Sequence, residues 1–241
     1  MSEVPAAPAP PPLPPPPAPP APAAAGFDFG KPFTYVFDDP RWLQKILIGG
    51  LFTLAAFLLI GWFFVLGYLA RVARNIIDGL ESPLPEWDDL GGYFNEGARL
   101  IGVTLCYTIP IAGICMFFIV PAILSDASDN DAVQAITGGF ATCLSCLIVP
   151  LILAIVFFLP ASLLFAVVER RFGAAFEFGR IWPFIKANIG NYLLAIVIAF
   201  IARILGGLGI FLLCVGVIFT AFWSLLVLTH GFAQVYRLRK T

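Results

Sequence analysis

The chain has few of the groups from which catalytic and metal sites are commonly built. Its 241 residues include a single histidine, His230, and only 12% of them are charged. Most catalytic triads and metal sites need more histidine side chains than this. The sequence also has neither a Walker loop nor a G-x-S-x-G motif. The 14 basic and 15 acidic residues nearly cancel, which argues against a nucleic-acid partner bound through a basic patch. We therefore expect no nucleic acid, no cofactor and no metal ion.

Charge is also missing from long stretches of the sequence. Hydrophobic residues make up 60% of the chain, whereas soluble domains are about 45–50% apolar. The charge-free runs are 46–70, 100–125, 132–168, 187–202 and 204–236. About 20 apolar residues of helix cross a hydrocarbon core of about 30 Å, and a helix satisfies its own backbone polar groups there. The sequence predicts an all-α polytopic membrane protein, with the lipid bilayer as a partner.

The membrane domain is expected over residues 33–241, in four transmembrane helices and one harder segment. Its apolar segments are placed at 46–70, 100–125, 148–168, 189–205 and 210–230. The run 132–168 would make a helix of about 55 Å, so only its second part is placed as a span and 132–147 at the interface. The last two segments read as a tight hairpin in which small residues pack closely. These residues are Ala195 and Ala199 on one helix, and Gly216, Thr220 and Ser224 on the other.

The N-terminal residues have a different composition. Residues 1–25 contain 12 prolines and 8 alanines, with Glu3 as the one charge. Proline fixes φ and donates no backbone hydrogen bond, so the sequence predicts a disordered Pro/Ala-rich tail over 1–32. The stretch has no basic region followed by an apolar core, so it is not a signal peptide.

Lysine and arginine in the loops predict the orientation. After the first segment the basic residues lie in 71–99, in 169–186 and at the C-terminus, apart from Arg203 near the turn of the hairpin, and the loop 126–131 has none. We therefore expect the protein in the plasma membrane, with the three basic regions on the cytoplasmic side. A single span over 46–70 would place Lys31, Arg41 and Lys45 outside. A re-entrant hairpin broken near Ile60-Gly61 keeps them inside, so four spans plus a hairpin are favoured over five spans.

Several motifs are shared with one known family. They are Asp38-Asp39-Pro40-Arg41-Trp42, the stretch Gly67 to Arg74, and Pro83-Leu84-Pro85-Glu86-Trp87-Asp88-Asp89. Together they resemble the prokaryotic integral membrane family known as domain of unknown function 4013, from about residue 33 to 237. The resemblance implies a helical membrane fold and carries no activity.

The acidic loop after the first segment holds the candidate binding residues. Glu86, Trp87, Asp88 and Asp89 follow two prolines, and carboxylates near the membrane surface can serve as a docking site for a protein partner or hold a cation. The plainer interpretation is a solvated loop that its prolines and Trp87 fix at the headgroups. The polar stripe Arg71, Arg74, Asn75 and Asp78 predicts that a helix continues into this loop.

Two cysteines offer the one redox hypothesis. Cys143 and Cys146 have the C-x-x-C spacing of dithiol centres. Cysteine also packs as a small hydrophobe in helices, and no basic residue is near in sequence to lower a thiol pKa.

The sequence therefore favours a non-enzymatic scaffold or partner-binding membrane protein with a cytoplasmic C-terminus. A transporter or channel-like protein for a neutral solute is the first alternative, because no carboxylate lies inside a span to couple ions. A membrane thiol–disulfide oxidoreductase is the second. Faces rich in glycine and alanine would serve self-association as well as internal packing, so a homo-oligomer stays open.

Overall fold

The computed structural model describes residues 26–126, 131–211 and 216–239, with only part of the side chains between 118 and 147. Every regular element in these ranges is helical, which confirms the all-α prediction. The elements are α1 (Lys31–Thr34), η1 (Tyr35–Asp38), α2 (Trp42–Ala55), η2 (Ala56–Leu58), α3 (Gly61–Asp78), α4 (Leu90–Asp126), α5 (Asp131–Glu169), η3 (Phe172–Phe176), α6 (Phe178–Ala187), α7 (Ile189–Gly207), η4 (Leu208–Phe211) and α8 (Gly216–Arg239).

The first apolar segment is a broken pair of helices. The chain turns at Leu59, which has a φ of 64°, so α2 ends just before the predicted break at Ile60-Gly61 and α3 begins there. α2 and α3 pack against each other, and the rings of Phe52 and Phe64 stack between them at 4.8 Å. The turn exposes Phe57 by 85% of its surface. An apolar tip of this kind belongs in lipid.

α3 is the central helix of the body. It contacts α2, α4, α5 and α8, and ten of its eighteen residues are buried. A Cβ on Gly67 of α3 would lie 1.9 Å from the carbonyl oxygen of Tyr93 in α4, and one on Gly97 of α4 would lie 1.7 Å from that of Phe63 in α3. Two glycines thus allow the backbones of α3 and α4 to touch.

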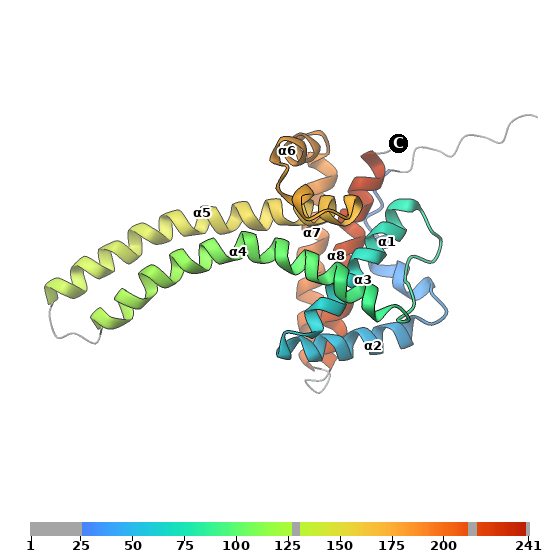
Figure 1. Ribbon diagram of the computed structural model, residues 1–241, viewed down its shortest axis with the longest axis horizontal. Coiled ribbons are helices and arrows are strands. Elements are labelled where there is room, and N and C mark those ends of the chain that lie inside the picture. The colour runs from blue at the N-terminus through green and yellow to red at the C-terminus, as the bar shows by residue number, and fades with distance from the viewer. Residues whose placement is uncertain (1–25, 127–130, 212–215, 240–241) are drawn as a thin grey trace, which may run out of the picture.

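α7 and α8 form the hairpin that the sequence predicts, and they stand upright in Figure 1. Small residues make the contact. A Cβ on Gly206 would come within 3.0 Å of Ser224 Cβ, and Gly231 packs on Ala195. The Thr220 hydroxyl donates to the carbonyl of Gly206 at 2.7 Å.

α4 and α5 extend from the body as a long antiparallel arm, which runs across the direction of α7 and α8 in Figure 1. They contain 37 and 39 residues, so each is about 55–60 Å long. α5 includes Pro150 and Pro160, and each proline removes a helix hydrogen bond. Residues 132–147, which we expected at the interface, are continuous with the predicted span 148–168.

Among the described residues, four helices are long and apolar enough to cross a membrane. They are Leu90–Phe117, Ile148–Glu169, Ile189–Phe211 and Gly216–Arg239. A fifth candidate is the pair Lys31–Asp38 and Trp42–Leu58, bent by 109°. The fifth candidate differs from the predicted segment 46–70, because 46–70 is divided between α2 and α3 and α3 also carries Arg71, Arg74 and Asp78.

The N-terminal segment lies along α8. The phenol of Tyr35 donates to the carbonyl of Leu226 at 3.1 Å, and the Asp28 carboxylate accepts from the backbone N–H of Lys31 at 3.1 Å. Phe27 packs on the core. Residues 26–32, which the sequence assigns to the tail, are therefore part of the folded body, and residues 1–25 lie outside the described ranges.

α6 packs on the body through part of its surface. Ile181 and Ile185 are completely buried, whereas Phe178 and Trp182 are exposed by 49% and 43%. The two aromatic rings are free to anchor at headgroups.

Candidate functional site

Loop 80–89, which joins α3 to α4, begins with a sharp helix end. α3 stops at Gly79, whose φ of 80° is left-handed and favours glycine. The N–H of Leu80 returns to the carbonyl of Asn75 at 3.0 Å, and that of Gly79 to Ile76 at 3.1 Å. This cap sends loop 80–89 back along α2 and α3.

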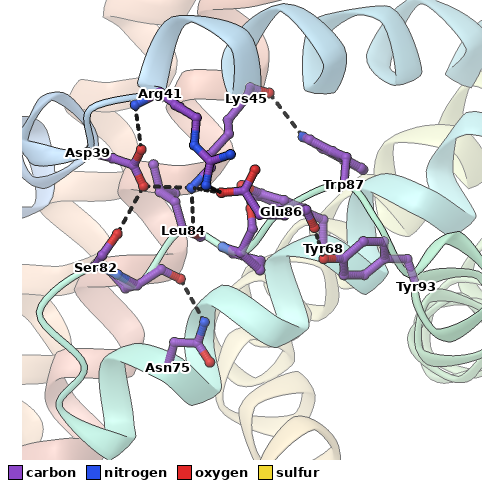
Figure 2. Close-up of polar contacts among 12 residues, drawn as sticks. Asp39, Arg41, Lys45, Tyr68, Asn75, Ser82, Leu84, Glu86, Trp87 and Tyr93 are labelled. Carbon is purple, nitrogen blue, oxygen red and sulfur yellow. Dashed lines mark hydrogen bonds and ion pairs between the residues drawn. The ribbon is translucent and has the colours of Figure 1, made fainter.

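Four consecutive carbonyls of this loop accept hydrogen bonds from side chains. Pro83 and Pro85 have no N–H, so this stretch cannot form regular backbone hydrogen bonds. Side chains of the adjoining helices instead donate to its carbonyls (Figure 2). The donors and acceptors are Asn75 Nδ2 to Pro83 at 2.9 Å, Lys45 Nζ to Leu84 at 2.8 Å, Tyr68 Oη to Pro85 at 3.0 Å, and Tyr93 Oη to Glu86. Because buried backbone carbonyls need partners, these contacts hold the loop in one conformation.

Lys45 is the centre of this arrangement (Figure 2). Its ammonium lies 2.7 Å from Asp39 Oδ2 and 2.8 Å from Glu86 Oε1, and only 5% of the side chain is exposed. With the carbonyl of Leu84, the three donors of the ammonium have three acceptors. Arg41 also pairs with Glu86 at 2.7 Å, from the solvent side.

Asp39 is buried with its charge compensated. Burial alone would raise the pKa of its carboxyl. Hydrogen bonds from Lys45 Nζ, the N–H of Arg41 at 2.8 Å and the hydroxyl of Ser82 at 2.9 Å outweigh burial, so the pKa lies below its usual value. Asp39 is therefore ionised at neutral pH.

Trp87 is a packing residue of the same site. Its ring stacks on Tyr68 at 4.1 Å and on Phe52 at 4.9 Å, and its indole N–H donates to the carbonyl of Lys45 at 3.2 Å. The predicted binding residue thus joins loop 80–89 to α2 and α3, with its ring packed inside the protein.

The three candidate carboxylates lie in different environments. Glu86 is neutralised by Lys45 and Arg41. Asp89 caps α4 by accepting from the N–H of Gly92 at 2.9 Å, and it pairs with Arg71 at 2.7 Å. The bond from Arg71, followed by that from Gly92, lowers the pKa of Asp89. Asp88 is exposed, and within the described ranges its carboxylate has no ion-pair partner.

A hollow of about 200 Å³ lies beside Asp88. Its lining comes from α2 and the loop: Gln44, Lys45, Ile48, Glu86, Trp87 and Asp88. Three of the four predicted binding residues therefore border one concave surface, and Asp89 lies outside it.

Cys143 and Cys146 fall in one continuous helix, α5. Cys146 is an exposed free thiol, and the side chain of Cys143 lies outside the described part. Among the described residues no group of three or more His, Cys, Asp or Glu side chains could hold a metal ion.

Sequence reasoning missed Asp39 and Lys45 as members of the site. The available signal was Lys45 itself, the last charge before an apolar run of 25 residues. A lysine at the start of such a run needs a carboxylate partner when it is buried.

Loop 80–89 and the side chains of α3 and α4 that hold it fall within a recognised family, whereas Asp39, Arg41 and Lys45 precede the matched residues. The model of the protein family of unknown function DUF4013 matches residues 50–230. The chain belongs to the DUF4013 family. The match includes two of the motifs that carry the resemblance, Gly67 to Arg74 and Pro83–Asp89, and the third, Asp38 to Trp42, lies before it. No curated protein and no solved structure matches the chain.

Proposed function

We propose that this DUF4013 protein is a non-enzymatic membrane scaffold that binds a protein partner at loop 80–89. The observation behind the proposal is the side-chain capture of four consecutive loop carbonyls, which fixes the loop before any partner arrives. A surface that is already ordered loses less conformational entropy on binding.

The charge at this surface selects the kind of partner. Among the three carboxylates of residues 86–89, Glu86 and Asp89 are neutralised from within the chain, so Asp88 is the one left for an incoming group. It borders the hollow of about 200 Å³ together with the indole of Trp87. A partner segment that places a lysine or arginine beside an apolar side chain fits this combination.

The basic residues near this surface support a cytoplasmic partner. Arg71, Arg74 and Arg99 flank loop 80–89, and Arg237 and Arg239 follow the apolar part of α8. By the positive-inside rule these segments lie on the cytoplasmic side of the plasma membrane. Partner and C-terminus then lie on the same side.

The test changes Asp88 alone. Replacing Glu86 or Asp89 would release Lys45 or Arg71 and disturb the loop, so neither is a clean probe. We expect Asp88→Lys to reduce a co-purifying protein at least about fivefold after cross-linking in native membranes, because a like charge replaces the attractive one. Asp78→Lys, an exposed carboxylate at the end of α3, is the matched control.

The measurement is quantitative mass spectrometry of the cross-linked, affinity-purified full chain. Unchanged elution on size exclusion shows that the variants fold. Loss of the same protein from the Asp88 and the Asp78 variant, or from neither, would overturn docking at this loop.

A further inference from the structure

A second cavity lies at the opposite side of loop 80–89, between the N-terminal segment, the end of α3 and α8. Its volume is about 410 Å³, within the range of small-ligand sites. The floor is buried and comes from Tyr35, Ile76, Pro83 and His230. Docking at Asp88 does not involve these residues.

The rim of the cavity has equal numbers of cations and anions. Lys31 and Arg237 provide the positive charges, and Asp38 and Glu81 the negative ones. Lys31 and Asp38 neutralise each other at 2.7 Å. Arg237 and Glu81 have no ion-pair partner in the described ranges, so one guanidinium and one carboxylate remain for a ligand.

Arg237 lies at the mouth, beside the end of α3. A Cβ on Gly79 would lie 3.1 Å from its Nη2, so the guanidinium rests against the left-handed residue that ends α3. Carbonyls at a helix C-terminus carry partial negative charge, which favours a cation there. The group is thus held where an incoming phosphate oxygen could accept from its free N–H groups.

The floor contains a polar group that is not satisfied. His230 is 7% exposed, its ring lies 4.5 Å from that of Tyr35, and its Nδ1 has no hydrogen-bond partner among the described residues. Buried polar atoms without partners are rare in folded proteins and mark places where water or a ligand completes the structure.

We propose that this cavity binds a phosphate–ammonium zwitterion, the headgroup of phosphatidylethanolamine. Arg237 takes the phosphate and Glu81 takes the primary ammonium. A purely anionic group would leave the carboxylate of Glu81 without a counter-ion. A purely cationic group would leave Arg237 without one. The cavity lies where the apolar part of α8 gives way to Arg237 and Arg239, which is the depth at which lipid headgroups are found.

The test compares lipids on the purified full chain by native mass spectrometry in detergent. We expect phosphatidylethanolamine to be retained more strongly than phosphatidylglycerol, whose headgroup has no cation, and than phosphatidylcholine, whose trimethylated nitrogen cannot donate to Glu81. Arg237→Gln is expected to weaken retention of phosphatidylethanolamine about tenfold, the size expected for loss of a charged hydrogen bond. Glu81→Gln is expected to abolish its preference over phosphatidylglycerol while phosphate binding persists.

Two neutralising variants serve as controls. Arg203→Gln removes an exposed arginine of α7, and Asp78→Asn removes an exposed carboxylate three residues before Glu81; both are expected to retain lipid as the unmodified protein does. Equal retention of the ethanolamine and glycerol lipids, or a preference that Glu81→Gln leaves intact, would overturn the proposal. Free phosphoethanolamine that displaces the lipid at comparable concentration would overturn the lipid as the source while supporting the chemistry.

Discussion

The ammonium of Lys45 lies 2.7 Å from Oδ2 of Asp39, and 5% and 3% of the two side chains are exposed. A buried ion pair stabilises a fold only when its remaining hydrogen-bonding groups are satisfied. Here Glu86 and the carbonyl of Leu84 complete the ammonium, and Ser82 and the N–H of Arg41 complete the carboxylate. The pair therefore ties the start of α2 to loop 80–89.

Removing one member of this pair should be costly. Lys45→Met leaves Asp39 and Glu86 without their shared cation, and we expect a loss of about 3–5 kcal/mol in the free energy of unfolding. Denaturant titration in detergent micelles measures it. The double variant Lys45→Met, Asp39→Asn should lose less than the sum of the two single losses. Strictly additive losses would show that the contact carries no coupling.

The same pair makes stability depend on acid. The folded-state pKa of Asp39 is lowered, so its ionised form stabilises the fold fully above the unfolded value of about 3.9. That contribution is lost as the pH falls through the folded pKa. We expect melting temperatures to be insensitive to Asp39 between pH 7 and 5. Below about pH 4, the unmodified protein should lose stability more steeply than Asp39→Asn. Parallel pH profiles for the two proteins would contradict this assignment, and Asp38→Asn is the neighbouring control.

The two glycines between α3 and α4 should not tolerate a methyl group. Gly67→Ala and Gly97→Ala each place a Cβ within 2 Å of a backbone oxygen of the other helix, which forces the helices apart. We expect each to cost about 1–3 kcal/mol or more in thermal or chemical unfolding. Gly91→Ala is the control in the same helix, because nothing lies within 4 Å of its Cβ position. It should be neutral or stabilising by about 0.5–1 kcal/mol, and equal losses in all three would contradict the close approach.

Trp87 should report on the loop. Trp87→Phe keeps an aromatic ring on Tyr68 but removes the indole N–H that donates to the carbonyl of Lys45. We expect a loss of about 1 kcal/mol in the free energy of unfolding. Trp87→Ala removes the stacked ring as well and should cost about 3–5 kcal/mol. Thermal unfolding measured by circular dichroism compares them. If the alanine variant were no less stable than the phenylalanine variant, the stacking would not contribute.

Hydropathy could predict the helices of this protein but not their ends. The predicted segments 189–205 and 210–230 lie within α7 to α8, because apolar length and the glycines between them are local signals. α4 begins at Leu90, ten residues before the predicted segment, since Asp89 caps it and Glu96 in its second turn pairs with Arg74 of α3. A window that counts charges cannot see that pairing.

The site was predictable only in part for the same reason. Pro83 and Pro85 indicate a loop whose carbonyls need outside donors, but the donors Lys45, Tyr68 and Tyr93 come from three different helices. Which side chain meets which carbonyl depends on how those helices pack. The acidic motif consequently predicts a surface, whereas in the structure Glu86, Trp87 and Asp89 contact other side chains of the protein and Asp88 is the exception, with no ion-pair partner in the described ranges.

The redox hypothesis can be settled by counting thiols. Cys146 is free, so we expect a mass-tagged maleimide to label it without prior reduction after acid quenching and denaturation in detergent. Because only the thiolate reacts and a thiol in lipid seldom ionises, labelling must follow denaturation. Cys146→Ser should remove one tag both with and without reductant. A tag number that rises by two on reduction in the unmodified protein, and fails to rise both in Cys146→Ser and in Cys143→Ser, would identify a disulfide between Cys146 and Cys143. The non-enzymatic scaffold would then give way to thiol–disulfide chemistry, because a scaffold has no use for a reversible dithiol.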